Sequence, residues 1–254
     1  MKSKIIHIVL WVLISSGFIV SLGFVNGQEQ KLVGKSLVVY VSEENGNNFI
    51  DADDLVQLIG ERGDTIRNQP LKDFKVYDLE SSLNSHPAIA KSEVTVTIDG
   101  RVIVQVKQRN PILRVIDRSN ESYYIDDEGK LMPLSEKFTA KVPVINGEFS
   151  VQGGKFSDTT LLGEFYKIGQ FIYADTFWKS QVESIYYTID KEYELLPRVG
   201  KNRIVFGTLS DMDDKFAKLL IFYKEGMGST GWWNNYSVIN LKFKNQIVCT
   251  KKNI

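Results

Sequence analysis

Residues 90–111 read AKSEVTVTIDGRVIVQVKQRNP and contain two runs of alternating apolar and polar residues around Asp99-Gly100. Alternation with a period of two is typical of strands, and Asp-Gly between two such runs indicates a β-hairpin. A two-residue loop would place the valines of the two runs on opposite faces, because side-chain direction alternates along a strand. We therefore predict a three-residue loop, Ile98-Asp99-Gly100, with Gly100 in the left-handed conformation. All five valines of the hairpin then share one face, which a layer of helices must cover.

The residues before the hairpin supply that layer. A short apolar strand is predicted over residues 36–41, and a helix begins near Asp51, an N-cap candidate with Asp54 three residues later. A second helix is predicted over residues 77–84, and it stops before Pro87 because the residue preceding a proline avoids helical geometry. The resulting order, β-α-α-β-β, predicts two helices packed on a three-stranded sheet.

The composition excludes several classes of function. The chain has 254 residues with 31 basic and 31 acidic side chains, so its zero net charge does not favour nucleic acid as a partner. Cys249 is the single cysteine and cannot form an intramolecular disulfide, and the two histidines lack metal-ligand spacing. Gly153-Gly154 has none of the residues that surround a phosphate-binding loop. We therefore expect no metal site, no cofactor and no enzymatic activity.

The N-terminus carries an uncharged apolar run from Ile5 to Val25, preceded by Lys2 and Lys4. About 21 residues at roughly 1.5 Å per residue match the hydrocarbon core of a bilayer. Two interpretations remain open: an uncleaved signal anchor, which the length favours, or a signal peptide cleaved near Gly27. The leading lysines predict a short N-terminus in the cytoplasm and export of the rest. The favoured interpretation is a single-pass protein of the cytoplasmic membrane.

After residue 111 the pattern changes to a strand-rich region with two helices. A long helix is predicted over residues 159–179, and a second over residues 211–224 with Ser210 and Asp213 as its capping signature. Residues 149–155 and 226–231 read as loops. Strands are predicted over residues 112–116, 122–125, 130–133, 142–145, 182–189, 193–197 and 203–206.

The last strand is predicted over residues 236–249, YSVINLKFKNQIVC, which alternate along their whole length. In one interpretation, the lysines on the polar face of this edge strand prevent it from pairing with another copy of itself. In the other, the strand is an edge that accepts a partner strand. The two interpretations are compatible. The Lys251-Lys252 tail either meets acidic residues of a partner or is simply solvated. One face of the strand carries Ile239, Leu241, Phe243 and Ile247, and the other carries Asn240, Lys242, Lys244 and Gln246.

A series of short motifs resembles a known family. The order β-α-α-β-β resembles a POTRA (polypeptide-transport-associated) domain, and the motifs together resemble the FtsQ/DivIB family of bacterial cell-division proteins. Each motif alone is unspecific, so their order along the chain carries the resemblance. Gln108 stands where the family has a glutamate and Ala88 where it has an aromatic residue. The motifs are Leu83, His86-Pro87-Ala88-Ile89, Val94 and Val96, VKQRNP at residues 106–111, YIDDEG at residues 124–129, and VPVING at residues 142–147.

The resemblance implies a non-catalytic, membrane-anchored scaffold of the division machinery at the septum. It implies that an FtsB-like partner adds a strand to the last strand of the chain, with an FtsL-like protein alongside, and Phe243 falls where the family has an important tyrosine. The alternative is an exported POTRA-type chaperone or assembly module, which usually carries several POTRA repeats. The residues predicted to bind the partner are Ile239, Leu241, Lys242, Phe243, Asn245 and Ile247.

The predicted fold class is α+β. An N-terminal membrane helix precedes a POTRA-like β-α-α-β-β domain, and a mostly antiparallel β domain with two helices follows. The short cytoplasmic end and the anchor occupy residues 1–28, the POTRA-like domain residues 36–108, and the β domain residues 109–254.

Overall fold

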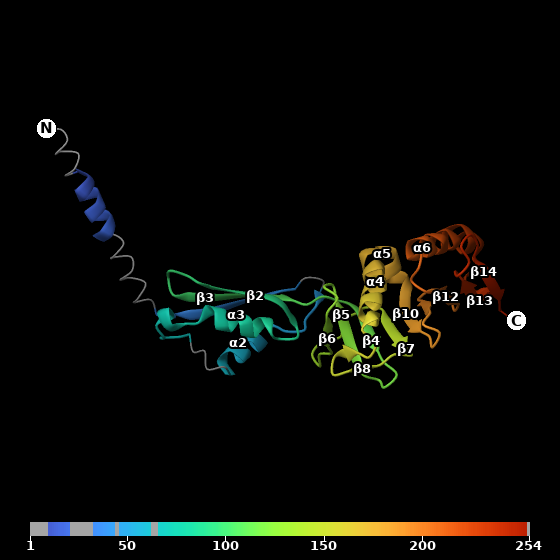
Figure 1. Ribbon diagram of the computed structural model, residues 1–254, viewed down its shortest axis with the longest axis horizontal. Coiled ribbons are helices and arrows are strands. Elements are labelled where there is room, and N and C mark those ends of the chain that lie inside the picture. The colour runs from blue at the N-terminus through green and yellow to red at the C-terminus, as the bar shows by residue number, and fades with distance from the viewer. Residues whose placement is uncertain (1–9, 21–32, 44–45, 62–65, 253–254) are drawn as a thin grey trace. The chain divides into compact units, whose positions relative to one another are not determined.

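A computed structural model describes residues 10–20, 33–43, 46–61 and 66–252 (Figure 1). The predicted anchor from Ile5 to Val25 lies partly outside the described residues, of which residues 10–20 are helical. Within the described ranges, no helix has the length and apolar character needed to cross a membrane. The chain divides into two compact units, Met1–Gln108 and Arg109–Ile254.

The first unit has the predicted β-α-α-β-β order. Its sheet has the strand order β1-β3-β2, in which β1 runs parallel to β3 and β2 runs antiparallel to it. A single turn of 3-10 helix, η2 (Leu71–Asp73), precedes the second helix. The elements are β1 (Ser36–Ser42), α2 (Ala52–Glu61), α3 (Val76–Asn84), β2 (Ile89–Val96) and β3 (Arg101–Gln108).

Local sequence signals explain where α2 begins. The backbone N–H of Asp54 donates to the Asp51 carboxylate over 2.9 Å, and the N–H of Asp51 donates to the Asp54 carboxylate over the same distance. This reciprocal capping confirms Asp51 as the N-cap, because it satisfies donors that a helix start leaves unpaired. The helices then bury one apolar stripe each: Leu55 and Ile59 from α2, and Leu79 and Leu83 from α3.

The hairpin of β2 and β3 has the predicted three-residue loop. Val96 pairs with Val102 and Val94 with Val104, so the valines lie on one face. The Thr97 N–H donates to the Arg101 carbonyl over 2.9 Å. Gly100 has a φ of 89°, the left-handed conformation that glycine adopts without steric cost.

Four hairpin turns of the described chain share this geometry. In each, the first residue's side chain accepts the backbone N–H of the fifth residue, and the fourth residue is left-handed. The first residues are Thr97, Asp117, Asp126 and Thr188. The left-handed residues are Gly100, Asn120, Gly129 and Lys191, with φ of 89°, 64°, 77° and 60°.

The second unit is a nine-stranded sheet with helices on one face (Figure 1). Three parallel pairs, β4–β7, β7–β10 and β12–β13, interrupt a mostly antiparallel arrangement. The strand order is β14-β13-β12-β11-β10-β7-β4-β5-β6. The strands are β4 (Pro111–Ile116), β5 (Ser122–Asp126), β6 (Leu131–Pro133), β7 (Val144–Gly147), β10 (Val182–Tyr187), β11 (Tyr193–Pro197), β12 (Arg203–Gly207), β13 (Tyr236–Asn240) and β14 (Val248–Lys251). The helices are α4 (Thr160–Ala174), α5 (Thr176–Gln181) and α6 (Met212–Ile221).

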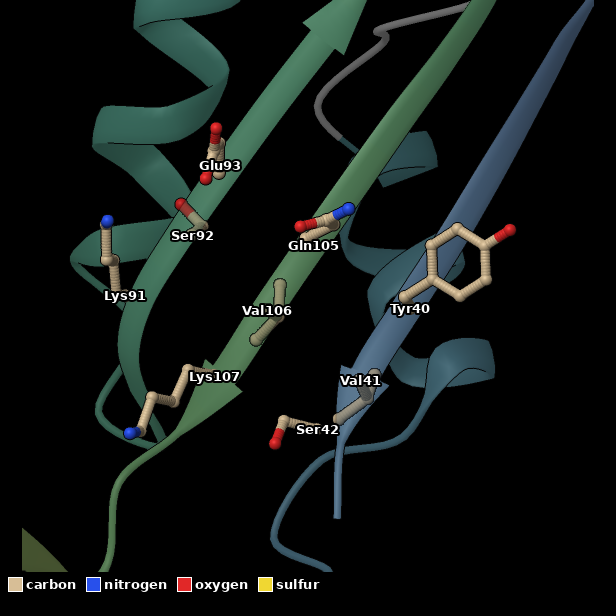
Figure 2. Close-up of a pocket in the computed structure, with 9 residues that line it drawn as sticks. All are labelled: Tyr40, Val41, Ser42, Lys91, Ser92, Glu93, Gln105, Val106 and Lys107. Atoms are coloured by element: carbon tan, nitrogen blue, oxygen red, sulfur yellow. The ribbon is translucent and has the colours of Figure 1, made fainter. Parts of the chain in front are cut away.

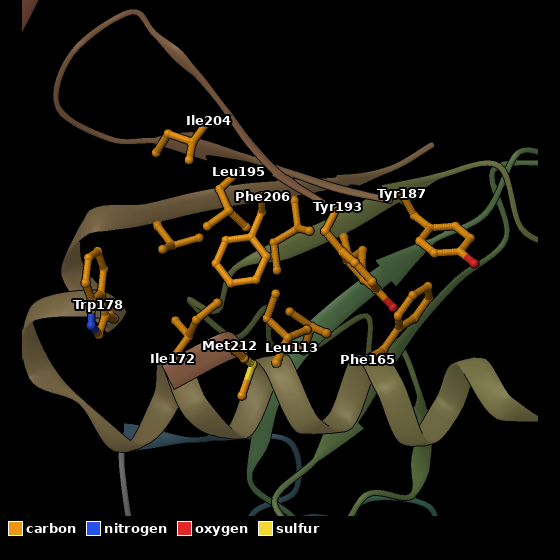
Figure 3. Packing of buried hydrophobic residues seen from close by; sticks show 14 of the residues in the cluster. Leu113, Phe165, Ile172, Trp178, Tyr187, Tyr193, Leu195, Ile204, Phe206 and Met212 are labelled. Carbon is orange, nitrogen blue, oxygen red and sulfur yellow. The ribbon is translucent and has the colours of Figure 1, made fainter. Parts of the chain in front are cut away.

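The core of this unit lies between the sheet and the helices (Figure 3). Neighbouring strands contribute one side chain each to a buried row that crosses the sheet in register, and aromatic rings from the helices pack on it. The row consists of Val115, Ile145, Ile185, Leu195, Ile204 and Ile239, and the helices add Phe165, Trp178 and Phe216.

The helix predicted over residues 159–179 is broken. Asp175 is extended, with φ −111° and ψ 121°, and separates α4 from α5. Its carboxylate accepts the backbone N–H groups of Phe177 and Trp178 over 2.8 and 3.1 Å, so it caps the second helix. The change of direction brings Trp178 into the core at 4% exposure.

Other local predictions are also wrong. Asp211, not Ser210, precedes α6 as the N-cap, and no side chain caps the helix. Residues 226–231 are not a loop: a π-helix, η3 (Phe222–Gly228), continues from α6, and a 3-10 turn, η4 (Trp232–Asn234), follows. Burial of Tyr223 and Met227 against the core outweighs the helix-breaking tendency of the glycines. Residues 149–155 contain a strand of a small hairpin formed by β8 (Val151–Gln152) and β9 (Lys155–Phe156).

Candidate partner-binding edge

The C-terminal segment is a hairpin, and the prediction of one strand over residues 236–249 is wrong. β13 ends at Asn240, β14 starts at Val248, and the two strands pair antiparallel with Ile239 opposite Cys249. Apolar alternation continues through the intervening residues, so the pattern does not mark the turn. Folding back pairs the last residues with β13 and makes β14 the edge of the sheet.

A lysine from α6 holds the connection between β13 and β14. The Lys218 ammonium donates to the carbonyl oxygens of Phe243 over 2.6 Å and Lys244 over 3.2 Å, with a longer contact of 3.5 Å to Leu241. Hydrogen bonds from a charged donor are stronger than neutral ones. No periodicity in the sequence identifies Lys218, because its partners are main-chain atoms more than 20 residues away.

The six predicted partner-binding residues divide into two groups. Ile239 and Leu241 are fully buried in the core, so their side chains are not available at the surface. Ile247 is half-buried and packs against the same core. Lys242, Phe243 and Asn245 are exposed, and Phe243 has 46% of its surface accessible.

The free edge of β14 offers main-chain groups that the sequence reading missed. The Lys252 N–H donates to the Asn235 carbonyl over 2.9 Å, so Lys252 faces β13. Successive residues of an antiparallel strand direct their N–H and C=O groups to alternate sides. The backbone groups of Cys249 therefore point away from β13, toward the open edge, whereas the Lys251 carbonyl accepts the Ser237 hydroxyl of β13 over 3.5 Å.

The surroundings of this edge are positively charged. Lys242, Lys244, Lys251 and Lys252 lie in the last 19 residues of the chain, which contain no acidic side chain. Lys242 pairs with Glu192 over 2.6 Å. Cys249 is half-buried, and burial raises the pKa of its thiol. The edge therefore combines open hydrogen-bonding groups, lysines and the exposed ring of Phe243.

The first unit has a shallow hollow of about 300 Å³ on its three-stranded sheet, at the end where β1 and β3 finish (Figure 2). Tyr40, Gln105 and Glu93 pair in register across it. In the described part of the chain, no group of three or more His, Cys, Asp or Glu could hold a metal ion.

Gln108 is the last residue of β3 and is 6% exposed, and both ends of its amide group form hydrogen bonds. Its Oε1 accepts the N–H groups of Phe49 and Ile50 over 2.8 and 3.2 Å. Its Nε2 donates to the carbonyls of Ser42 and Asn47 over 3.2 Å each. A carboxylate could accept the first two bonds but could not donate the others.

Comparisons with known families agree with the two units. Residues 32–107 match a family described as POTRA-like domain, and residues 110–250 match one described as FtsQ/DivIB, C-terminal related. A comparison with curated proteins found no match. Because the second of these families covers more than half of the sequence, the chain belongs to the FtsQ/DivIB family.

Proposed function

We propose that the protein is a non-catalytic scaffold of the bacterial division machinery, and that the free edge of β14 accepts a strand from an FtsB-like partner with an FtsL-like protein alongside. The FtsQ/DivIB family consists of non-catalytic cell-division proteins. The observation that carries the proposal is the position of β14 at the sheet edge. We further propose that the run from Ile5 to Val25 anchors the protein in the cytoplasmic membrane at the division site.

In this proposal, the main chain of β14 provides most of the affinity, and the side chains beside it determine which partner binds. An added strand would bond to the outward N–H and C=O groups of Cys249, since strand addition gains affinity from main-chain bonds. The exposed Phe243 ring offers apolar area beside the edge. Lysines at an edge disfavour pairing between identical copies, because like charges would meet, and this leaves the edge free for a partner of different charge.

A proline at the edge tests strand addition directly. Cys249→Pro removes an N–H that points away from β13, and proline is tolerated at an edge strand whose N–H faces solvent. We expect the full-length variant to fold and to bind the FtsB-like partner about tenfold more weakly or worse, since it loses one hydrogen bond and meets a steric block. Cys249→Ala keeps the N–H and is the matched control. Equal affinity of the two variants in a titration would exclude strand addition at β14.

Phe243 tests the side-chain contribution. Phe243→Asp should weaken binding by a few kcal/mol, because an unpaired charge would be buried under the partner. Phe243→Tyr keeps the ring and restores the hydroxyl of the family, so it should bind at least as well as the wild type. Unchanged affinity of the aspartate variant would remove Phe243 from the interface.

Depletion in cells tests the biological role. Cells that lack the protein should elongate without septation. Expression of Cys249→Ala should restore division, and Cys249→Pro should not. Normal cell length after depletion would contradict a role as a division scaffold.

A further inference from the structure

One end of the first unit contains the residues that follow the proposed membrane anchor along the chain. β1 begins at this end, and the Lys35 N–H donates to the Gly100 carbonyl of the β2–β3 turn over 2.8 Å. The Gly34 N–H donates to the Gln69 carbonyl over 2.9 Å, so the segment before η2 lies alongside the start of β1. Figure 1 shows the β2–β3 turn and the start of β1 at the same end of the unit. This proximal end consists of the described residues 33–35, 66–78 and 97–101.

The proximal end exposes large apolar side chains. Ile98, the second residue of the β2–β3 turn, is 94% exposed, more than any other large apolar residue that the structure describes. Tyr77 is 79% exposed in the first turn of α3, and Val33 is 43% exposed. α3 starts at this end, because its later residues bond to progressively earlier residues of β2. Tyrosine and large apolar residues are typical of surfaces that meet the interfacial layer of a membrane.

The proximal end also carries more basic than acidic side chains that are open to a partner. Two of its exposed acids are already paired, Asp78 with Lys75 over 3.7 Å and Asp99 with Arg101 over 2.8 Å. One further acid of this end, Asp73, is exposed. The exposed basic side chains that form no ion pair with another described residue are Lys35, Arg67 and Lys72. Anionic lipid headgroups would complement these cations.

The length of the chain limits how far this end can lie from the anchor. Seven residues, 26–32, separate Val25 at the end of the apolar run from Val33. A fully extended chain spans at most about 3.6 Å per residue, so these eight steps span at most about 29 Å. Such a short tether turns a weak contact into an intramolecular one, with an effective concentration of about millimolar. A few interfacial side chains are therefore enough to hold the proximal end against the bilayer.

We propose that the proximal end lies on the outer surface of the cytoplasmic membrane, with Ile98 and Tyr77 in the interfacial layer and the unpaired cations at anionic headgroups. This inference rests on the proposed anchor from Ile5 to Val25. The turn is suited to the contact because its backbone bonds hold Ile98 at the tip, while Arg101 neutralises the neighbouring acid. The contact would set the orientation of the first unit against the membrane, which a tether alone does not do.

Full-length protein in lipid nanodiscs tests the contact. Ile98→Cys in a Cys249→Ala background carries one environment-sensitive dye, and the nanodiscs contain lipids with a spin label near the headgroup that quenches the dye. Ile189→Cys is the matched control, because Ile189 holds the same position in a turn of the same type and is 81% exposed. With phosphatidylglycerol in the bilayer, we expect bluer emission and quenching at least about twofold stronger at position 98 than at position 189.

Two further variants test the chemistry of the contact. Replacing Lys35 and Lys72 by glutamine should lower the quenching at position 98 to the level found in nanodiscs of phosphatidylcholine alone, because the attraction to anionic headgroups is lost. Tyr40→Ser removes an exposed side chain of the same unit that lies outside the proximal end, and it should leave the quenching unchanged.

The outcomes separate this inference from the proposals on which it depends. A protein that fails to co-elute with nanodiscs would refute the anchor and, with it, this contact. Co-elution with an unquenched dye at position 98, or equal quenching at positions 98 and 189, would overturn the contact and leave the anchor standing. Ile98→Ser should bind the FtsB-like partner with unchanged affinity, because the β14 edge lies in the other unit.

Discussion

Gln108→Glu replaces the amide nitrogen of a buried side chain by an oxygen. The substitution therefore tests whether this position needs an amide or accepts a carboxylate. The wild-type side chain accepts two backbone N–H groups through Oε1 and donates to two carbonyls through Nε2. The glutamate keeps the two accepted bonds. Its second oxygen would then face the carbonyl oxygens of Ser42 and Asn47 with no hydrogen between them.

The expected cost follows from these contacts. The two hydrogen bonds that Nε2 donates are lost, at about 0.5–1.5 kcal/mol each. In their place, a charged carboxylate oxygen faces two carbonyl oxygens and is repelled by them. Because Gln108 is only 6% exposed, water cannot compensate. We expect the variant to lose about 2–4 kcal/mol of unfolding free energy in the first unit at pH 7.

The loss should depend on pH. Burial and the facing carbonyls favour the protonated acid, so the pKa of the new glutamate rises above its unfolded value of about 4.3. The folded state then binds more protons than the unfolded state above that pH, and stability falls as the pH rises. The deficit should be small below about pH 4, where both states are protonated and the acid donates one bond, and should grow toward neutral pH.

Hydrogen exchange measured by mass spectrometry is the suitable assay, because it reports the amides of α2 and β3 separately from the second unit. Gln69→Glu in the same unit is the control, since that side chain is exposed and should change stability by less than about 0.5 kcal/mol. Wild-type protection of Gln108→Glu at pH 7, or a deficit independent of pH, would refute the assigned amide orientation.

Three further substitutions test the second unit by urea unfolding followed through tryptophan fluorescence. Asp126→Asn breaks the 2.6 Å ion pair between Asp126, whose side chain is 2% exposed, and Arg109, whose side chain is 11% exposed. The substitution should lower the free energy of unfolding by about 3 kcal/mol. A cost below about 1 kcal/mol would show that the pair is not needed. Asp175→Ala removes the cap of α5 and should cost about 1 kcal/mol, whereas Asp175→Asn should retain most of it. Lys191→Gly relieves a left-handed lysine and should gain about 1 kcal/mol, and a loss would mean that this φ carries no strain.

Local rules predicted the first unit well. The alternation of the valines around Asp99-Gly100 determined the loop length, because only one register places them all on one face, and the structure has that register. Asp51 and Asp54 marked the start of α2 through a signal contained in four residues. In both cases the deciding interaction lies within a short segment, so the sequence contains all the information needed.

The second unit departs from prediction where distant contacts decide. The apolar pattern of residues 159–179 continues across Asp175, because α4 and α5 pack on the same core. The apolar pattern therefore cannot reveal the break. Asp175 itself is a residue type that favours the N-cap position, and this is the one local sign that a second helix starts there. The glycines at 226 and 228 predicted a loop, but burial of Tyr223 and Met227 keeps the segment helical.

The C-terminal hairpin changes how the proposed recognition of a partner would work. As one strand, residues 236–249 would offer a partner a face of apolar side chains, yet Ile239 and Leu241 lie at 0% exposure. As a hairpin, the segment offers the main chain of β14, which any extended peptide could pair with. Selectivity must then come from the flanks, where Lys218 holds the loop that exposes Phe243. Lys218→Met should therefore weaken partner binding although Lys218 lies on a helix outside the edge strand, and Lys218→Arg should restore part of it. Equal affinity of both variants and the wild type would mean that the edge is positioned without this lysine.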